Sequence, residues 1–247
     1  MRLANIWRHP IKGVSREELE RVELSVGRCL PYDRHWAIAH EEADLGTEED
    51  GWAKCSNFAR AARVPQYMAV SSVFDAAREE ITLSHPDQDD LVVQPDTDPG
   101  ALVRWVAAIS DPEKTMPVEV VSVGRGMTDS RDQTVSLHSL ASIKRLSEEV
   151  GVPLDQRRFR GNFWFDGPEA YAELDWVGKM LTIGEVEIEV VEPIARCQAT
   201  TVNPDTGEVD ARVLRVLKET NDHYNFGVFG IVRKRGNVAL GDTAQLH

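Results

Sequence analysis

Apolar and polar residues alternate over much of the first 95 positions, a pattern typical of strands that bury one face. Gly13, Gly27 and Pro31 supply turn signals between these segments. Residues 41–51 carry six carboxylates in eleven positions and predict a solvated, mobile loop; without a histidine they do not indicate a metal site. The predicted strands of this half cover residues 3–7, 21–24, 35–40, 67–73, 80–83 and 90–94.

A turn-rich stretch at residues 94–100 separates this half from the rest of the chain. After it, apolar spacing predicts a short helix over 101–109 that bridges two subdomains, and a β-branched run predicts a buried strand over 118–123. A second helix is predicted over 139–150, where Gly151 ends it. These boundaries divide the chain into residues 1–95, a connecting segment 96–117, and residues 118–247.

Strand signals return after Gly161 and continue to the end of the chain. Pro204 and Gly207 predict a hairpin loop over residues 203–208. Many short strands with few helices predict a mainly β protein with helices (α+β), built from barrel-like sheets. The remaining predicted elements are strands at 162–165, 180–183, 186–191, 226–232 and 239–246, and a helix at 212–220.

The net charge of the chain bears on which kinds of molecule it can bind. The 247 residues carry a formal net charge of −13, which disfavours binding of nucleic acid through its phosphates. Two basic clusters stand out against this acidity, at residues 157–160 and 233–235. They are either a local site for a small anionic ligand or solvated surface patches, and the sequence leaves both interpretations open.

Membrane and export signals are not evident in the chain. No apolar stretch approaches the roughly 20 residues of a membrane-spanning helix, and the start of the chain has no apolar run of signal-peptide length. The three cysteines are too far apart for a disulfide framework or a paired zinc knuckle. We therefore expect a cytoplasmic protein with reduced thiols and no membrane partner.

The three cysteines differ in their neighbours. Cys29 and Cys55 lie in segments without an activating group and are expected to be structural or incidental. Cys197 follows Arg196 at the end of a predicted strand and precedes a Thr-Thr pair, a position that favours thiolate character. The local pattern fits a reactive thiolate and a buried strand thiol equally well.

Residues 195–208, ARCQATTVNPDTGE, resemble the signature of MOSC domains, the module found at the C-terminus of molybdenum cofactor sulfurases. Three further matches agree in order and spacing. The chain as a whole is similar to the two-domain form of the mitochondrial amidoxime reducing component and its bacterial relatives. The supporting segments are HPIK at 9–12 with DRHW at 33–36, FRGN at 159–162, and Phe226-Gly227 with VALGD at 238–242.

The resemblance implies an N-terminal β-barrel-like domain at 1–95, a C-terminal MOSC β-barrel domain at 118–247, and a molybdenum cofactor, a molybdenum–pterin. Cys197 stands where the reductase branch binds molybdenum through a cysteine, and a soft thiolate suits a metal held by sulfur. It is therefore both the catalytic and the metal-binding candidate. The implied cofactor-binding residues are Lys12, Arg34, Arg160, Asn162 and Arg196, with Thr200 and Thr201 as weaker candidates.

Two positions depart from the reductase relatives, which often have serine where this chain has Gly13 and Ala195. Each change removes a hydroxyl donor worth about 1 kcal/mol, so both bear on pterin affinity and substrate scope. His9 and His35 are expected to pack rather than to catalyse.

Three functions follow from the resemblance. The first is a molybdenum-cofactor-dependent oxidoreductase that reduces N-hydroxylated or N-oxide-like small molecules. Because the three cysteines cannot hold an iron–sulfur cluster and no dinucleotide motif is present, it implies a separate electron donor, a ferredoxin-like or flavin reductase. The second is a sulfur carrier or transferase with a persulfide on Cys197. The third is a non-catalytic protein that binds the cofactor.

Overall fold

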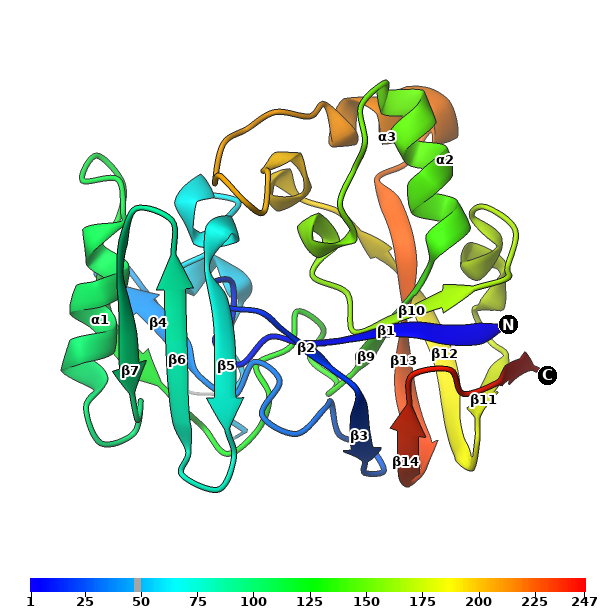
Figure 1. Ribbon diagram of the computed structural model, residues 1–247, viewed down its shortest axis with the longest axis horizontal. Helices are drawn as coiled ribbons and strands as arrows, with labels where there is room; N and C mark the ends of the chain where they lie inside the picture. The colour runs from blue at the N-terminus through cyan, green and yellow to red at the C-terminus, as the bar shows by residue number, and fades with distance from the viewer. Residues whose placement is uncertain (47–49) are drawn as a thin grey trace.

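Two lobes lie side by side in the computed structural model, which describes residues 1–46 and 50–247 (Figure 1). The first lobe carries two small sheets and helix α1, and the second carries one large sheet with helices α2 and α3 beside it. The described ranges are mainly β with three α-helices, which confirms the predicted mainly β, α+β class. Part of the acidic segment 41–51, residues 47–49, lies outside the described residues.

The large sheet has eight strands in the order β15-β11-β12-β13-β9-β10-β1-β2. β9 and β10 are parallel, and the other neighbouring pairs are antiparallel. The end strands β15 and β2 do not pair with each other, so the described strands form no closed barrel. Its strands are β1 (Arg2–Arg8), β2 (Glu17–Leu19), β9 (Val135–Ser139), β10 (Phe163–Asp166), β11 (Met180–Ile183), β12 (Val186–Ala195), β13 (Asn225–Lys234) and β15 (Ala244–Leu246).

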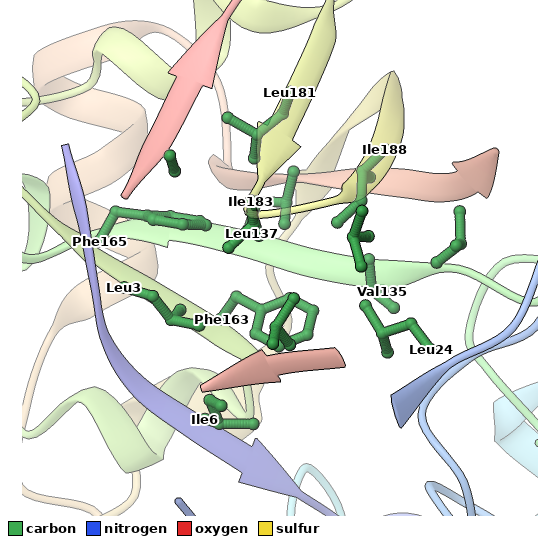
Figure 2. Close-up of a cluster of buried hydrophobic side chains, with 14 of the residues drawn as sticks. Leu3, Ile6, Leu24, Val135, Leu137, Phe163, Phe165, Leu181, Ile183 and Ile188 are labelled. Atoms are coloured by element: carbon green, nitrogen blue, oxygen red, sulfur yellow. The ribbon is translucent and has the colours of Figure 1, made fainter. Parts of the chain in front are cut away.

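The first 24 residues contribute strands to the second lobe, some to the large sheet and some to a separate two-stranded sheet. β1 pairs with β10, and β3 (Arg21–Leu24) pairs with β14 (Gly236–Ala239). Their apolar faces enter the main core, where Leu3, Ile6 and Leu24 pack with Phe163 and Leu137 (Figure 2). The segment nearest the N-terminus is therefore part of the same folding unit as the segment nearest the C-terminus.

The first lobe combines a three-stranded antiparallel sheet with a two-stranded ladder. Helix α1 (Pro99–Ala108) packs against both, through β7 and β8. Asp98 caps it by accepting a hydrogen bond from the Ala101 amide at 3.0 Å, and Pro99 opens its first turn. The sheet consists of β5 (Ser71–Asp75), β6 (Glu80–His85) and β7 (Gln88–Val93), and the ladder of β4 (Ala37–His40) and β8 (Pro117–Val121).

Strand β8 differs from its prediction in burial and in partner. It pairs with β4 of the first lobe, and Val118 is 52% exposed because the two-stranded ladder leaves one edge of β8 without a neighbour. The strand predicted over 118–123 is confirmed, but its predicted burial is wrong. The domain boundary placed at residue 118 stays a prediction.

The predicted helices over 139–150 and 212–220 correspond to α2 (Leu140–Val150) and α3 (Val213–Asn221). The Ser139 hydroxyl caps α2 by accepting a hydrogen bond from the Ala141 amide, and Gly151 ends it with φ +84°. Five short 3-10 helices complete the described structure: η1 (Cys55–Asn57), η2 (Pro65–Ala69), η3 (Gln156–Phe159), η4 (Ala172–Trp176) and η5 (Gln198–Thr201). No helix in the described ranges has the length and apolar character needed to cross a bilayer.

Two predicted strands are wrong in part, and one central strand was missed. Residues 65–69 form η2, because Pro65 starts a tight turn that buries three consecutive residues instead of alternate ones. The strand predicted over 239–246 breaks at Gly241, whose φ is +87°. β9 carries five buried residues, including two serines and a histidine, so it shows no alternation to detect.

A buried carboxylate ties the start of the chain to the second lobe. Asp33 accepts hydrogen bonds from the His9 backbone amide at 2.7 Å and from Asn162 Nδ2 at 3.2 Å, and it forms an ion pair with Arg34. Although burial raises it, the neighbouring Arg34 and His9 donors hold the Asp33 pKa well below its usual range. The group is therefore charged in the folded protein, and its charge fixes three separate segments.

The guanidinium of Arg16 is a second buried charged group, and it links the two lobes at a different place from Asp33. It donates hydrogen bonds to the backbone oxygens of Met68, Val70 (3.0 Å) and Pro204 (2.6 Å). Only 4% of Arg16 is exposed. One side chain thus satisfies carbonyl groups of η2 in the first lobe and of the 203–208 loop in the second.

Replacing Arg16 by methionine tests this link. The variant keeps most of the side-chain volume but leaves three buried carbonyls without a donor, so the free energy of unfolding should fall by about 2–4 kcal/mol. Chemical denaturation measures this change. Arg212→Met, at an exposed position, is the matched control and should change stability by about 0.5 kcal/mol or less. Equal effects of the two substitutions would contradict the role of Arg16.

Stability should also fall in mild acid. Burial, with nearby Arg160, lowers the pKa of His9 to about 3, so His9 stays neutral when folded and takes up a proton near pH 6.5 when unfolded. Linkage then lowers the free energy of unfolding by about 2–3 kcal/mol for this group between pH 6.5 and 4.5. Asp33, whose pKa is also lowered in the folded protein, adds a loss of stability in the same direction, but only below about pH 4, outside this window. Denaturation across the window is the measurement, and a flat profile would refute the expectation.

Candidate functional site

A cavity opens where the two lobes meet, and most of the predicted site residues line it. It encloses about 870 Å³ of space between protein atoms, its open mouth included. Its walls come from the segment after β1, the loop before β4, the stretch from η1 to η2, the β8–β9 loop, the end of η3 and the end of β12. The predicted residues that line it are Lys12, Arg34, Arg160, Arg196, Cys197 and Thr200.

Oxygen atoms of the protein hold each of the four predicted cations. Lys12 Nζ donates to the Met127 carbonyl at 2.7 Å and to Asp129 Oδ1 at 2.5 Å. Arg34 pairs with Asp33 and donates to the Arg160 carbonyl at 3.1 Å. Lys12 and Arg34 each have a carboxylate partner, so their charges are compensated within the protein.

The other two cations have no carboxylate partner among the described residues and donate mainly to carbonyl oxygens. Arg160 donates to the backbone oxygens of Val14 (3.3 Å) and Ser15 (3.1 Å). Arg196 Nε donates to the Phe226 carbonyl at 2.7 Å and Nη1 to the Phe159 carbonyl at 2.9 Å. Carbonyl dipoles orient a guanidinium without neutralising it, so the positive charge of both arginines remains in the cavity.

The pKa values of these groups reflect the imbalance. Burial and neighbouring cations lower the pKa of Arg160 to about 9, and burial lowers that of Arg196 to about 9. Arg34 behaves differently: burial alone would lower its pKa, but the carboxylates of Asp33 and Asp129 raise it. Burial is the largest cause of the lowered pKa of Arg160 and Arg196, so both guanidinium groups are poorly solvated where they line the cavity.

The backbone at Arg34 and Arg160 is unusual for residues other than glycine. Their φ angles are +53° and +50°, in the left-handed region. The Arg34 amide donates to the His9 carbonyl at 2.7 Å, and the Arg160 amide donates to the Arg157 carbonyl at 3.2 Å. Local strain of this kind persists where surrounding contacts impose it, and here it brings two guanidinium groups to one cavity.

Cys197 lies between the end of β12 and the start of η5, and its side chain is exposed at the cavity wall. The alternative of a buried strand thiol is therefore wrong, and the reactive thiolate stays a prediction. The Thr200 hydroxyl donates to the Cys197 carbonyl at 3.0 Å, which holds the turn that presents the sulfur. Thr200 thus lines the cavity but uses its hydroxyl proton within the protein.

Two predicted residues do not line the cavity. Asn162 is buried beneath it, where its Oδ1 accepts a hydrogen bond from the Ser136 amide at 3.1 Å and its Nδ2 donates to Asp33. Thr201 donates to the Gln198 carbonyl at 2.6 Å and closes η5. In this structure both stabilise the walls of the site instead of facing a ligand.

The two basic clusters differ in whether they lie at the cavity or on the solvated surface. Within residues 157–160, Arg160 enters the cavity while Arg157 binds Asp155 and Asp205 at its edge. In the other cluster, Arg233 and Lys234 pair with Glu189 and Glu187 on the surface of the large sheet. The first cluster is a local site in part, and the second is a solvated surface patch.

Sequence reasoning missed several cavity residues. Cys55, expected to be incidental, lines the cavity, although desolvation and Asp129 raise its pKa and leave it an unactivated thiol. Arg158 lines it with its charge paired to Asp210 at 2.6 Å, and Asp129 and Arg60 line it as well. Arg158 belongs to the basic cluster noted at residues 157–160. Cys55, Arg60 and Asp129 come from segments without a motif, so the sequence carries no signal that brings those three to the cavity.

The local structure explains the glycine at position 13, where the reductase relatives often have serine. Gly13 has φ +73°, and a Cβ there would lie 2.3 Å from the Ala59 carbonyl oxygen. A serine at this position would require the wall formed by Ala59 and Arg60 to move away. Ala195 instead lies exposed at the cavity wall, where a longer side chain meets no such barrier.

Histidines lie under the cavity, not in it. His138 of β9 is fully buried between Gly161 and Gly227, where a Cβ on either glycine would come within 2.4 Å of its ring. Its ring stacks on Trp164 at 4.6 Å between centroids, and Arg196 Nη2 lies 3.4 Å from both ring nitrogens. Burial and Arg196 hold its pKa well below the usual value, so a neutral ring supports the guanidinium. His9 is equally buried, and His35 packs between Tyr32 and Trp36, in agreement with the expectation that both pack.

The donor set fits a molybdenum–pterin. Uncompensated guanidinium groups suit a phosphate, and an exposed thiol in the same cavity suits a metal held mainly by sulfur. In the described ranges no cluster of three or more His, Cys, Asp or Glu side chains could hold a metal ion. The protein can therefore offer one thiol ligand to a metal that arrives with its other ligands.

The chain is similar to known proteins over all or part of its length. The chain is 22% identical to human mitochondrial amidoxime-reducing component 1 over 297 residues, which cover 99% of this chain and 82% of that protein. It is 36% identical to molybdenum cofactor sulfurase 1 of Aedes aegypti over 85 residues, 34% of this chain and 11% of that protein. Among solved structures, the YUAD protein from Bacillus subtilis aligns with a TM-score of 0.48 and 11% identity, over 100% of this chain and 94% of that one.

Two family models account for most of the chain. The MOSC N-terminal beta barrel domain matches residues 1–109, and the MOSC domain matches residues 124–245. Cys197, Arg160 and Arg196 fall within the second match, and Lys12 and Arg34 within the first. The cavity is thus assembled from both matched segments, and the chain belongs to the MOSC-domain family, in the form that carries the MOSC N-terminal domain.

Proposed function

We propose that this protein is a molybdenum-cofactor-dependent oxidoreductase that reduces N-hydroxylated or N-oxide-like small molecules. The observation that carries the proposal is the cavity in which Arg160 and Arg196, without carboxylate partners, lie with the exposed thiol of Cys197. The names of the amidoxime-reducing relatives, which align over nearly the whole chain, support the choice of reaction.

The residues that would hold the cofactor follow from the cavity contacts. Arg160 and Arg196 would bind the pterin phosphate and polar ring edges, because each presents N–H groups from a fixed backbone position. Arg34 would add a guanidinium whose orientation Asp33 maintains. Cys197 would provide the protein ligand to molybdenum. Asn162 and Thr201 would act indirectly, through the segments they stabilise.

The cofactor, when bound, supplies the two-electron redox centre that the protein itself lacks. Reduction of an N-hydroxyl group consumes two electrons and two protons and releases one water molecule. Cys197 is exposed, so solvent reaches the reacting end of the cavity and can deliver protons there. The described side chains would contribute by binding the cofactor, orienting it and fixing the charge around it.

The electrons would come from a separate protein. The chain has three cysteines, one fewer than an iron–sulfur cluster needs, and Cys29 is buried with a pKa that burial raises to about 12. A ferredoxin-like or flavin reductase is the donor we expect. The small-molecule substrate and this donor complete the set of proposed partners.

Two other functions use the same cavity. In the first, Cys197 carries a persulfide and the protein is a sulfur carrier or transferase, an alternative favoured by the exposure of this thiol and by the match to a molybdenum cofactor sulfurase. In the second, the protein binds the cofactor and does not turn over a substrate. Both keep the cationic cavity and differ in what happens at Cys197.

Removing the thiol of Cys197 tests the leading proposal. Protein from cells that make molybdenum cofactor should contain molybdenum, and Cys197→Ala should lower the metal content at least about tenfold because a direct ligand is lost. Elemental analysis gives the ratio of metal to protein. Cys55→Ala, at the other cavity thiol, is the matched control and should keep its metal. Wild-type protein without molybdenum would refute the proposal.

A mass measurement separates the sulfur-carrier alternative. After incubation with a cysteine desulfurase and cysteine, a carrier should gain the mass of one sulfur atom on the peptide that contains Cys197. We expect no such adduct on the oxidoreductase. An adduct on Cys197 in protein that contains no molybdenum would favour the carrier over the reductase.

A further inference from the structure

Three guanidinium groups that line the cavity have no carboxylate partner among the described residues, one more than a phosphate dianion would balance. Six cationic side chains line it, and Asp33, Asp129 and Asp210 pair with Arg34, Lys12 and Arg158. Arg60, Arg160 and Arg196 have no carboxylate partner among the described residues. A phosphate group carries up to about two negative charges near neutral pH, which two of these guanidinium groups would balance.

Arg60 differs from the other two in its contacts. Arg160 and Arg196 each donate to at least two backbone carbonyls, whereas within the described part of the chain the Arg60 side chain makes one weak hydrogen bond, to the sulfur of Cys55 at 3.9 Å. Its Nε is buried and has no acceptor within hydrogen-bonding distance. A buried donor without an acceptor is costly, and here the missing acceptor would have to come from a ligand in the cavity.

The wall around Arg60 leaves space for such a ligand. Ala59, Ala61 and Ala62 flank the arginine and line the same cavity, so no large side chain of this segment competes for its N–H groups. This segment comes from the stretch between η1 and η2, separate in sequence from the β12–η5 turn that carries Arg196 and Cys197. Arg60 therefore lies on a different wall of the cavity from Arg196 and Cys197.

We propose that Arg60 binds an anionic group on the substrate, so that the protein prefers N-oxygenated compounds that also carry a carboxylate. This inference rests on the proposed reductase function and adds the substrate class. The guanidinium would form a bidentate contact with the carboxylate, which places the N-oxygenated end of the molecule toward the part of the cavity that holds Cys197. Neutral substrates would enter the same cavity without this contact.

The test compares an aryl amidoxime with the same amidoxime carrying a para-carboxylate. In Arg60→Gln the KM of the carboxylate compound should rise about tenfold or more, since a charge-assisted pair is lost. The kcat, the KM of the neutral compound and the molybdenum content should not change. Arg60→Lys should show a smaller rise because it keeps the charge without the fork geometry. Arg63→Gln, an exposed arginine of the same segment, is the matched control and should behave as wild type.

Calorimetric titration with benzoate gives a readout independent of turnover: binding should weaken about tenfold in Arg60→Gln and stay unchanged in Arg63→Gln. Equal effects on both amidoximes, or no effect on either one, would overturn the inference. Loss of molybdenum in Arg60→Gln would also overturn it, by assigning Arg60 to the cofactor. If the wild-type protein holds molybdenum but reduces neither amidoxime, the proposed reaction fails, while the benzoate titration still decides whether Arg60 binds carboxylates.

Discussion

The geometry of the cavity depends on the buried carboxylate of Asp33. A buried charge is stable only where donors surround it, and Asp33 collects a backbone amide from His9, a guanidinium from Arg34 and an amide group from Asn162. These donors come from the segment after β1, the loop before β4 and the start of β10. Because each donor must reach the same point, the carboxylate fixes the relative position of the segments that carry Lys12, Arg34 and Arg160.

The cavity also shows why net charge is a poor guide to a local site. The protein as a whole carries −13, yet three guanidinium groups without a carboxylate partner among the described residues line one partly enclosed cavity. The acidic exterior would repel anions at long range, a repulsion that salt screens over about 8–10 Å. Inside the cavity, close contacts with guanidinium groups dominate. This arrangement favours small anions that can enter and disfavours anionic polymers that cannot.

The sequence predicted which residues meet in the cavity better than how the cavity is built. Lys12, Arg34, Arg160, Arg196 and Cys197, chosen from the motifs, all line one cavity, while their roles toward a cofactor stay predictions. Asn162 and Thr201 carry the same signal but work beneath the surface, and a motif cannot distinguish a ligand contact from a supporting one. Arg60 and Asp129 were missed, since long-range folding alone brings their irregular segments to the cavity. The fully buried strand β9 was missed because polar His138 and Ser139 find partners that alternation does not reveal.

The placement of β1 has a consequence for dividing this protein. One matched family model ends at residue 109 and the other begins at residue 124, so a fragment would naturally be made by cutting the chain between them. A fragment that starts at that point would lack β1 and β3, leaving the edges of β10 and β14 unpaired and Phe163 without Leu3 and Ile6 beside it. The segment that matches the MOSC domain therefore depends on the N-terminal strands for its sheet and core. The cavity exists only in the chain that contains both matched segments.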